Sequence, residues 1–150
     1  MKSRHQVDLT VAAALTLYLD SLISQAKRSA TVRTQKNQLR RFFGPALGQP
    51  LLTLSAERLR ELAALLAVSL NRRTGAPLTS QTLSFCRDAA RWFTGWCKAQ
   101  GRLKSDPMRK MPRSFAWLHS EASQLRADLE ALRQERDLAR QALHSGEGAP

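Results

Sequence analysis

The chain has 150 residues, 43% of them hydrophobic, which is enough for one compact domain with an appendage. Its net charge is +12, and residues 1–113 hold 20 basic and 6 acidic residues, against 4 and 6 in residues 114–150. A basic front part indicates a polyanionic partner, because Lys and Arg that neutralise phosphates release bound counterions. Solubility alone is the alternative interpretation of this charge. No apolar run is long enough to span a membrane, and no secretory signal is visible.

Cys86 and Cys97 fall on one predicted helix, about 16 Å apart along its axis, which is too far for a disulfide. Neither has a Cys or His neighbour at the spacing of metal ligands, so we expect no metal site and no cofactor. The three histidines are scattered, and acidic residues are too sparse in residues 1–113 to propose an acid–base pair. Two unpaired thiols fit a reducing cytoplasm.

Apolar periodicity predicts an all-α fold, with helices joined by short breaks. A flexible stretch over residues 1–9 is followed by Thr10 as the N-cap of a helix that ends near Lys27 and Arg28. A second helix is expected over 31–43, before a Gly-Pro stop. Ser55 is expected to cap a third helix, whose core positions are Leu59, Leu62, Leu66 and Leu70.

The fourth helix is predicted from Ser80 to about Gln100 and carries two adjacent apolar stripes. Two stripes indicate a wide buried face and a central position in the bundle. Their members are Leu83, Cys86, Ala90, Phe93 and Cys97 in the first, and Phe85, Ala89, Trp92 and Trp96 in the second. Core packing is therefore expected for Trp92, Phe93 and Trp96, with stacking on nucleic-acid bases as the alternative. A basic linker is expected over 108–113.

The last predicted helix covers residues 114–145 and is followed by a disordered tail over 146–150. Its apolar positions alternate in steps of four and three, which is typical of a coiled coil, with one polar break at Arg136. These positions predict self-association, most simply as a parallel dimer, although the spacing itself sets neither strand number nor orientation. Folding back onto the bundle is the alternative. The oligomerisation candidates are Leu118, Ala122, Leu125, Leu129, Leu132, Ala139 and Leu143.

Residues 10–107 resemble the N-terminal, SAM-like core-binding domain of phage-type tyrosine recombinases, the integrases. The resemblance rests on the order and spacing of four segments: LTVAAALTLYLDSL (9–22), SATVRTQKNQLRRFFGPALGQPLLTL (29–54), SAERLREL (55–62) and LTSQTLSFCRDAARWFTGWCKAQGRLKSDPM (78–108). It covers about two thirds of the chain and consists of helix caps and apolar positions. It implies a bundle of four or five helices that clamps one side of duplex DNA. It also implies a cytoplasmic location, associated with a bacterial or phage nucleoid.

The chemistry of that family requires a tyrosine nucleophile with Arg, Lys and His groups from a second, catalytic domain. The single tyrosine here is Tyr18, on an apolar helix face where we expect it to pack. The residues after the bundle fit a coiled coil rather than a catalytic domain. The chain is therefore predicted not to be an enzyme.

Candidate DNA-binding residues fall in four groups, on the second helix, in the turn before the fourth helix, on the fourth helix and in the segment after it. Basic side chains would contact phosphates, and polar groups at a helix N-terminus bind phosphate or base edges. A solvated face and simple N-capping are the alternatives. The candidates are Arg28, Arg33, Lys36, Arg40, Arg41, Arg72, Arg73, Thr79, Ser80, Gln81, Arg87, Arg91, Arg102 and Lys104.

These features together predict a non-catalytic, double-stranded-DNA-binding accessory or regulatory protein of a mobile genetic element. It would dimerise through its C-terminal helix and assist or repress a separate recombinase. One alternative is a protein-interaction adaptor that binds nucleic acid only weakly, and another is a decaying integrase fragment. RNA also stays open as a partner, because attraction to phosphates does not discriminate by itself.

Overall fold

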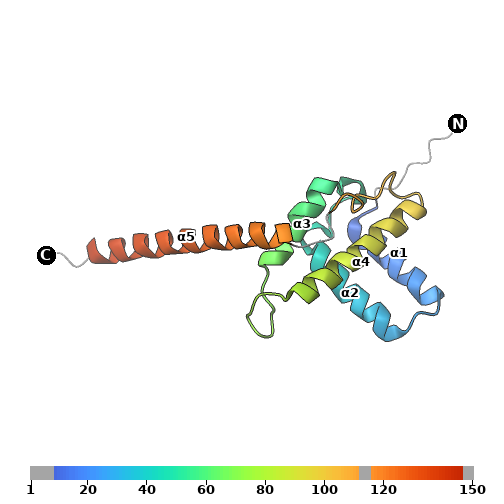
Figure 1. Cartoon of the computed structure of the whole chain (residues 1–150), viewed down its shortest axis with the longest axis horizontal. Coiled ribbons are helices and arrows are strands. Elements are labelled where there is room, and N and C mark those ends of the chain that lie inside the picture. Colours follow the sequence, from blue (N-terminus) through green and yellow to red (C-terminus); the bar gives the residue numbers. More distant parts are fainter. Residues whose placement is uncertain (1–8, 112–115, 147–150) are drawn as a thin grey trace.

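The computed structural model describes residues 9–111 and 116–146, with side chains of the last helix described from residue 124 onward. The described residues form an all-α fold, as predicted: four helices pack into a bundle and a fifth extends away from it (Figure 1). The helices are α1 (Val11–Ser24), α2 (Ser29–Phe43), α3 (Ala56–Val68), α4 (Ser80–Ala99) and α5 (Ala116–Gly146), with short 3₁₀ turns η1 (Gly44–Ala46) and η2 (Leu51–Thr53).

Short polar side chains fix where three of the helices begin. The hydroxyls of Thr10, Ser55 and Thr79 accept hydrogen bonds from backbone N–H groups three residues on, at 3.1–3.2 Å. Each satisfies one N–H that the first helical turn leaves without a partner. The caps at Thr10 and Ser55 are as predicted, and α4 begins at Ser80 as predicted, with Thr79 as its cap.

Helix α1 ends at Ser24, earlier than the expected end near Lys27 and Arg28. Ala26 adopts a positive φ of 58°, and the N–H of Lys27 bonds back to the Leu22 carbonyl at 3.1 Å. This left-handed residue reverses the chain after α1, a role in which glycine is the usual residue. Because the sequence has Ala there, it gives no stop signal, and the end is not visible from residue types.

The core of the bundle is centred on Phe93 of α4. Its ring lies edge-on to those of Tyr18 and Phe43, at centroid distances of 5.7 and 5.3 Å. Tyr18 is buried as predicted, and its hydroxyl donates a hydrogen bond of 2.8 Å to Oε1 of Gln35 on α2. One aromatic contact set thus joins α1, α2 and α4, and such ring pairs add stability beyond the area they bury.

The first apolar stripe of α4 is buried as predicted, but the second stripe is only partly so. Ala89 is buried and Trp96 is half-buried, whereas Phe85 and Trp92 are 49% and 57% exposed. The expectation that Trp92 lies in the core is therefore wrong. The part of α2 beside these rings carries polar rather than apolar side chains, namely Thr31, Thr34, Gln35 and Gln38, and a hollow separates them from the rings.

The segment after α4 packs onto the bundle instead of leaving it as a linker at residue 108. Met108 and Met111 are buried in the core, so the packed part of the chain extends at least to Met111. Asp106 anchors the segment, because its Oδ1 accepts hydrogen bonds from the Thr94 hydroxyl (2.7 Å) and the Met108 N–H (2.9 Å). The remainder of the expected linker, at 112 and 113, lies outside the described residues, as do most of the two predicted flexible ends.

Replacing Asp106 with Ala is expected to lower the free energy of unfolding by about 2–3 kcal/mol, because hydrogen bonds to a carboxylate hold two groups in the interior. Urea unfolding followed by circular dichroism measures this loss. Asp106→Asn retains an acceptor oxygen and should lose less than half as much. Equal midpoints for the wild type and Asp106→Ala would show that the anchor contributes nothing.

Cys86 and Cys97 are unpaired and buried on one face of α4. Burial raises the pKa of Cys86, with Arg41 opposing the rise, and it raises the pKa of Cys97 to about 12, with Arg102 opposing. A buried thiol with a raised pKa stays protonated and unreactive in the folded state. The thiols therefore belong to the core.

The two buried thiols are expected to lower the stability of the fold at alkaline pH. A thiol in the unfolded chain ionises near pH 8.5, whereas the folded protein keeps Cys97 protonated up to about pH 12. Between these two pH values only the unfolded state loses the proton, so the free energy of unfolding falls as the pH rises. We expect the free energy of unfolding to fall above pH 9, by up to about 1.4 kcal/mol per pH unit for each thiol. Cys97→Ala should flatten the decline, and an unchanged slope in that variant would contradict the assignment.

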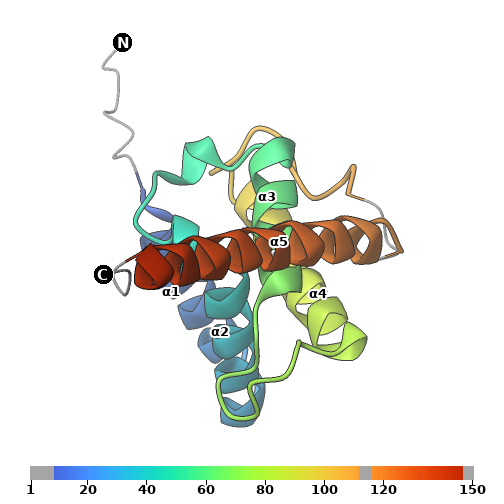
Figure 2. The ribbon, with the colours of Figure 1, turned by 90° about the vertical axis from the view of Figure 1, so that its left-hand side faces the viewer.

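Helix α5 has 31 residues, so it is roughly 46 Å long. It packs against α3 where it leaves the bundle (Figure 2). There Nη2 of Arg126 donates a hydrogen bond of 2.8 Å to the carbonyl of Ala67, near the C-terminal end of α3, where a cation is favourable. All described α5 side chains are exposed from residue 124 onward. That α5 pairs with a second helix stays a prediction, and the side chains of Leu118 and Ala122 lie outside those described.

Candidate nucleic-acid interface

Helix α2 carries the most concentrated positive charge of the bundle. Its 15 residues include four basic side chains and no acidic one. Those side chains, which we call the α2 basic surface, are all exposed, and they are Arg33, Lys36, Arg40 and Arg41. Among the described residues, none of the four makes an ion pair within 4.0 Å. Unneutralised cations grouped on one helix give a local field that attracts phosphate.

The α2 basic surface has two sides. Lys36 and Arg40 border a depression of about 310 Å³ between α1 and α2, which Asp20 of α1 also lines. Arg33 lies one helical turn before Lys36 and two before Arg40, so these three share an edge. Arg41 lies toward α4, since its charge acts on Cys86. The three-residue edge is therefore the continuous part of the surface.

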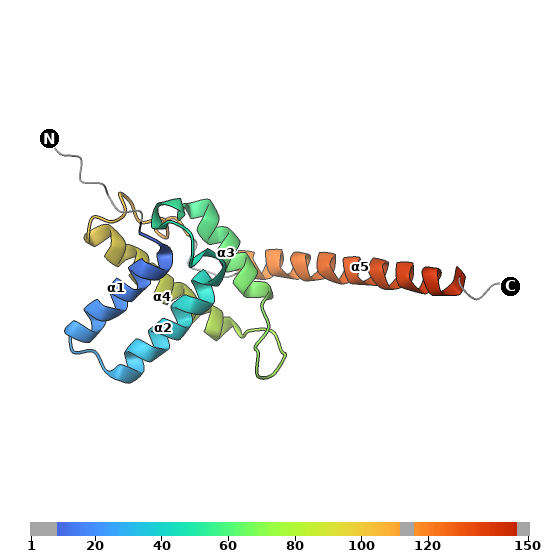
Figure 3. The same ribbon diagram turned by 180° about the vertical axis from the view of Figure 1, so that it is seen from behind.

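The loop between α3 and α4 carries Arg72 and Arg73 away from the bundle (Figure 3). Its base is closed by hydrogen bonds of 2.7 Å from the Asn71 N–H to the Ala76 carbonyl and from the Gly75 N–H to the Asn71 carbonyl. The Asn71 side chain also accepts from the Arg73 N–H at 2.9 Å. Both arginines are thus exposed on an ordered turn rather than on a loose chain.

The fourth-helix candidates divide into exposed and packed residues. Thr79, Ser80 and Gln81 are exposed, although the Thr79 hydroxyl is already engaged as the cap. The Arg87 side chain is only 11% exposed, and its Nη2 lies 3.2 Å from Oδ1 of Asp88. Arg91 is half-buried, with its Nε buried and without a hydrogen-bond partner among the described residues. The partial burial of Arg87 and Arg91 was not predicted from the sequence. Both residues lie outside the apolar stripes, where a pattern of residue types predicts an exposed side chain.

A second basic surface lies where the segment after α4 meets the start of α3. A hollow of about 710 Å³ there is lined by four basic side chains, which are Lys98, Lys104, Arg109 and Lys110. Arg102, another predicted DNA contact, is half-buried, with its guanidinium carbon 5.9 Å from the centre of the Trp96 ring. Lys98 was not among the predicted site residues. Its position near the end of the fourth helix does not indicate in the sequence that it lines a hollow.

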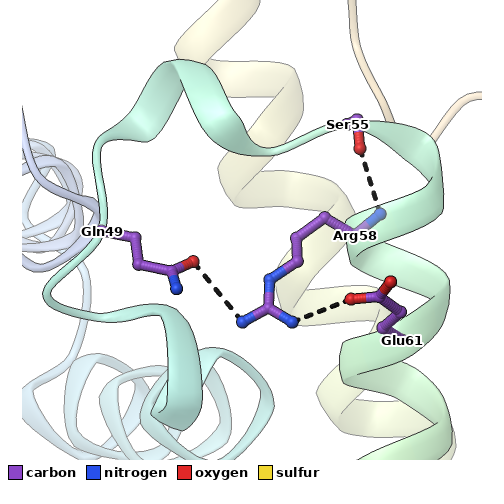
Figure 4. Close-up of polar contacts among 4 residues, drawn as sticks. All are labelled: Gln49, Ser55, Arg58 and Glu61. Carbon is purple, nitrogen blue, oxygen red and sulfur yellow. Dashed lines mark hydrogen bonds and ion pairs between the residues drawn. The ribbon is translucent and has the colours of Figure 1, made fainter.

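Arg58 illustrates a basic residue that the fold uses internally (Figure 4). The Arg58 guanidinium contacts Oε2 of Glu61 at 2.9 Å and Oε1 of Gln49 at 3.4 Å. The backbone N–H of Arg58 donates a hydrogen bond to the Ser55 hydroxyl. These contacts tie the start of α3 to the loop that follows α2. Among the described residues, the four side chains of the α2 basic surface make no ion pair of this kind, so their charge is available to a ligand, whereas that of Arg58 is used within the fold.

Comparisons with protein-family models, with curated proteins and with solved structures gave no match to this chain. The resemblance of residues 10–107 to a recombinase core-binding domain therefore stays a prediction.

Two further searches of the described residues bear on other functions. No group of three or more His, Cys, Asp or Glu side chains is placed to hold a metal ion in that part of the chain. None of the helices described is both long and apolar enough to cross a membrane.

Proposed function

We propose that the chain binds double-stranded DNA without catalysing a reaction, as an accessory or regulatory protein of a mobile genetic element. The observation that carries the proposal is the α2 basic surface, with four exposed cations on one helix and no acid on that helix. Phosphate contacts supply the sequence-independent part of DNA affinity. Arg72, Arg73 and Lys104 are exposed as well and extend the set of available cations.

The single tyrosine of this chain, Tyr18, is poorly placed to act as the nucleophile of a recombinase. Tyr18 is 5% exposed, its hydroxyl is bonded to Gln35, and burial, followed by the charge of Cys97, raises its pKa. A nucleophile in phosphoryl transfer must reach the phosphorus atom in line with the leaving group. The proposed role is therefore to assist or repress a separate recombinase, with two copies joined through α5.

The first test is DNA binding by the full-length protein across a salt series. Random duplex DNA, the duplex flanking its own gene and a matched double-stranded RNA are compared by fluorescence anisotropy. We expect binding to duplex DNA with a steep loss of affinity as salt rises, and a preference for the flanking DNA. Absence of binding at about 100 mM salt would overturn the proposal.

An adaptor function is the second candidate, and the exposed aromatic pair on α4 favours it. Phe85 and Trp92 border a hollow of about 430 Å³ beside α2, together with Asp88 and polar α2 side chains. Exposed aromatic residues are enriched where proteins bind one another. Trp92→Ala separates the two functions, because it should leave DNA affinity unchanged while removing binding to a protein partner.

A further inference from the structure

We infer that α5 pairs with the α5 of a second copy as a parallel, two-stranded coiled coil in register. This inference rests on the proposed self-association and specifies its geometry. Three independent features of the described part of α5 carry it: an unpartnered apolar seam, one polar seam position, and the distribution of charge on the two sides of the seam.

The seam is exposed along the described length of the helix. In heptad notation its core positions a and d are 129, 136 and 143, and 125, 132 and 139. The exposed fraction rises from 39% at Leu125 to 47% at Leu129, 60% at Leu132 and 73% at Leu143. Helix α5 packs on α3 beside the bundle (Figure 1), and every α5 side chain that the structure describes, from residue 124 onward, is exposed, so the described seam is largely uncovered by its own bundle. A repeat of this kind is buried by an equivalent helix.

The charges beside the seam differ completely between its two sides. The described e positions are all arginine, at 126, 133 and 140, whereas the g positions 128, 135 and 142 are Asp, Glu and Ala. In a parallel pair, a g residue meets the e residue five positions later on the partner helix. Asp128 would therefore meet Arg133 of the second copy, and Glu135 would meet Arg140, with the reciprocal pairs by symmetry.

An antiparallel pair would bring like charges together instead. There, g positions face g positions and e positions face e positions, so carboxylates meet carboxylates and arginines meet arginines. Charges at e and g select partner and orientation in coiled coils. Within the described chain, Arg133, Glu135 and Arg140 form no ion pair within 4.0 Å, and Asp128 accepts one hydrogen bond, of 3.0 Å, from Gln124. These groups therefore remain available for a second helix.

Arg136, at a core a position, favours two strands over more. A polar residue at a single a position specifies register and oligomer state at some cost in stability. Arg136 is 59% exposed, and its Nε lies 3.5 Å from Oδ1 of Asp137. Two strands leave the end of such a side chain in water, whereas three or four strands would enclose it.

The test exchanges the charges in the full-length chain. Asp128→Arg with Glu135→Arg places arginine at both acidic g positions, opposite the arginines at e, and we expect the dimer dissociation constant to rise roughly 10- to 100-fold, since four exposed ion pairs become repulsions. Adding Arg133→Glu and Arg140→Glu restores the parallel pairs with the wild-type net charge, and should return the constant to near the wild-type value. Sedimentation equilibrium measures the constant, and circular dichroism confirms that each variant is folded.

A disulfide reports orientation directly, because the native thiols are buried. Leu143→Cys, at the last a position, should cross-link two copies under mild oxidation if the helices are parallel. In an antiparallel pair the two sulfurs would lie near opposite ends of a seam roughly 38 Å long. No cross-link, no recovery in the fourfold variant, or a monomeric wild type would each overturn the inference. DNA binding is measured separately in the salt series, so the two failures are distinguishable.

Discussion

Replacing Arg33, Lys36 and Arg40 together with Ala is expected to cause the largest loss of DNA binding of any surface change in the bundle. Each lost phosphate contact reduces the slope of log affinity against log salt by about 0.9, so the triple variant should lose about 2.7 in slope. The fold should persist, because all three side chains are exposed and make no ion pair within the described residues. The slope is obtained from anisotropy titrations at about 50–200 mM salt.

Single variants provide the control for this prediction. Arg40→Ala should reduce the slope by about 0.9, whereas Arg60→Ala removes an equal, exposed charge from α3 and should leave the slope unchanged. Equal effects of the two would mean that net charge, rather than the α2 basic surface, drives binding. A triple variant with the wild-type slope would remove α2 from the interface and move attention to the hollow lined by Lys104, Arg109 and Lys110.

Truncating Leu132 to Ala is expected to weaken the dimer strongly. Leu132 lies at a core d position, and pairing would remove its exposed apolar area from water in both copies. At about 1–2 kcal/mol for each copy, the dissociation constant should rise roughly 30-fold to several hundred-fold. Sedimentation equilibrium over a range of protein concentrations measures the change.

Leu138 offers a matched comparison on the same helix. It is 65% exposed, against 60% for Leu132, but it lies outside the seam. Leu138→Ala therefore removes a similar exposed side chain and should change the dissociation constant less than threefold. If both substitutions had the same effect, α5 would associate through general hydrophobicity rather than through the predicted seam.

Local rules explain why much of the fold is predictable from the residues. Caps at Thr10 and Ser55, and the four- and three-residue spacing of apolar positions, depend on neighbours within one helical turn. The first stripe of α4 is buried accordingly. The all-α class and the order of the helices follow from such short-range signals.

The departures depend on contacts between segments far apart in the sequence. Trp92 shares the spacing of a core residue, but the α2 side chains beside it are polar and do not form an apolar contact surface for its ring. Arg87 and Arg91 share the spacing of surface residues, yet their surroundings partly bury them. The charge of α2 is visible in the sequence, whereas the hollow near Lys104 lies between the start of α3 and the segment after α4, which are far apart in the sequence.

The attachment of α5 to the bundle has a geometric consequence for a dimer on DNA. The bond from Arg126 to the Ala67 carbonyl and the packing on α3 fix the direction in which each bundle meets the rod. A parallel rod would then present its two bundles from one end with a set separation and rotation. Since B-DNA turns once in about 10.5 base pairs, such a dimer would be sensitive to the helical phase of its half-sites. Adding half a turn between half-sites would be more disruptive than adding a whole one.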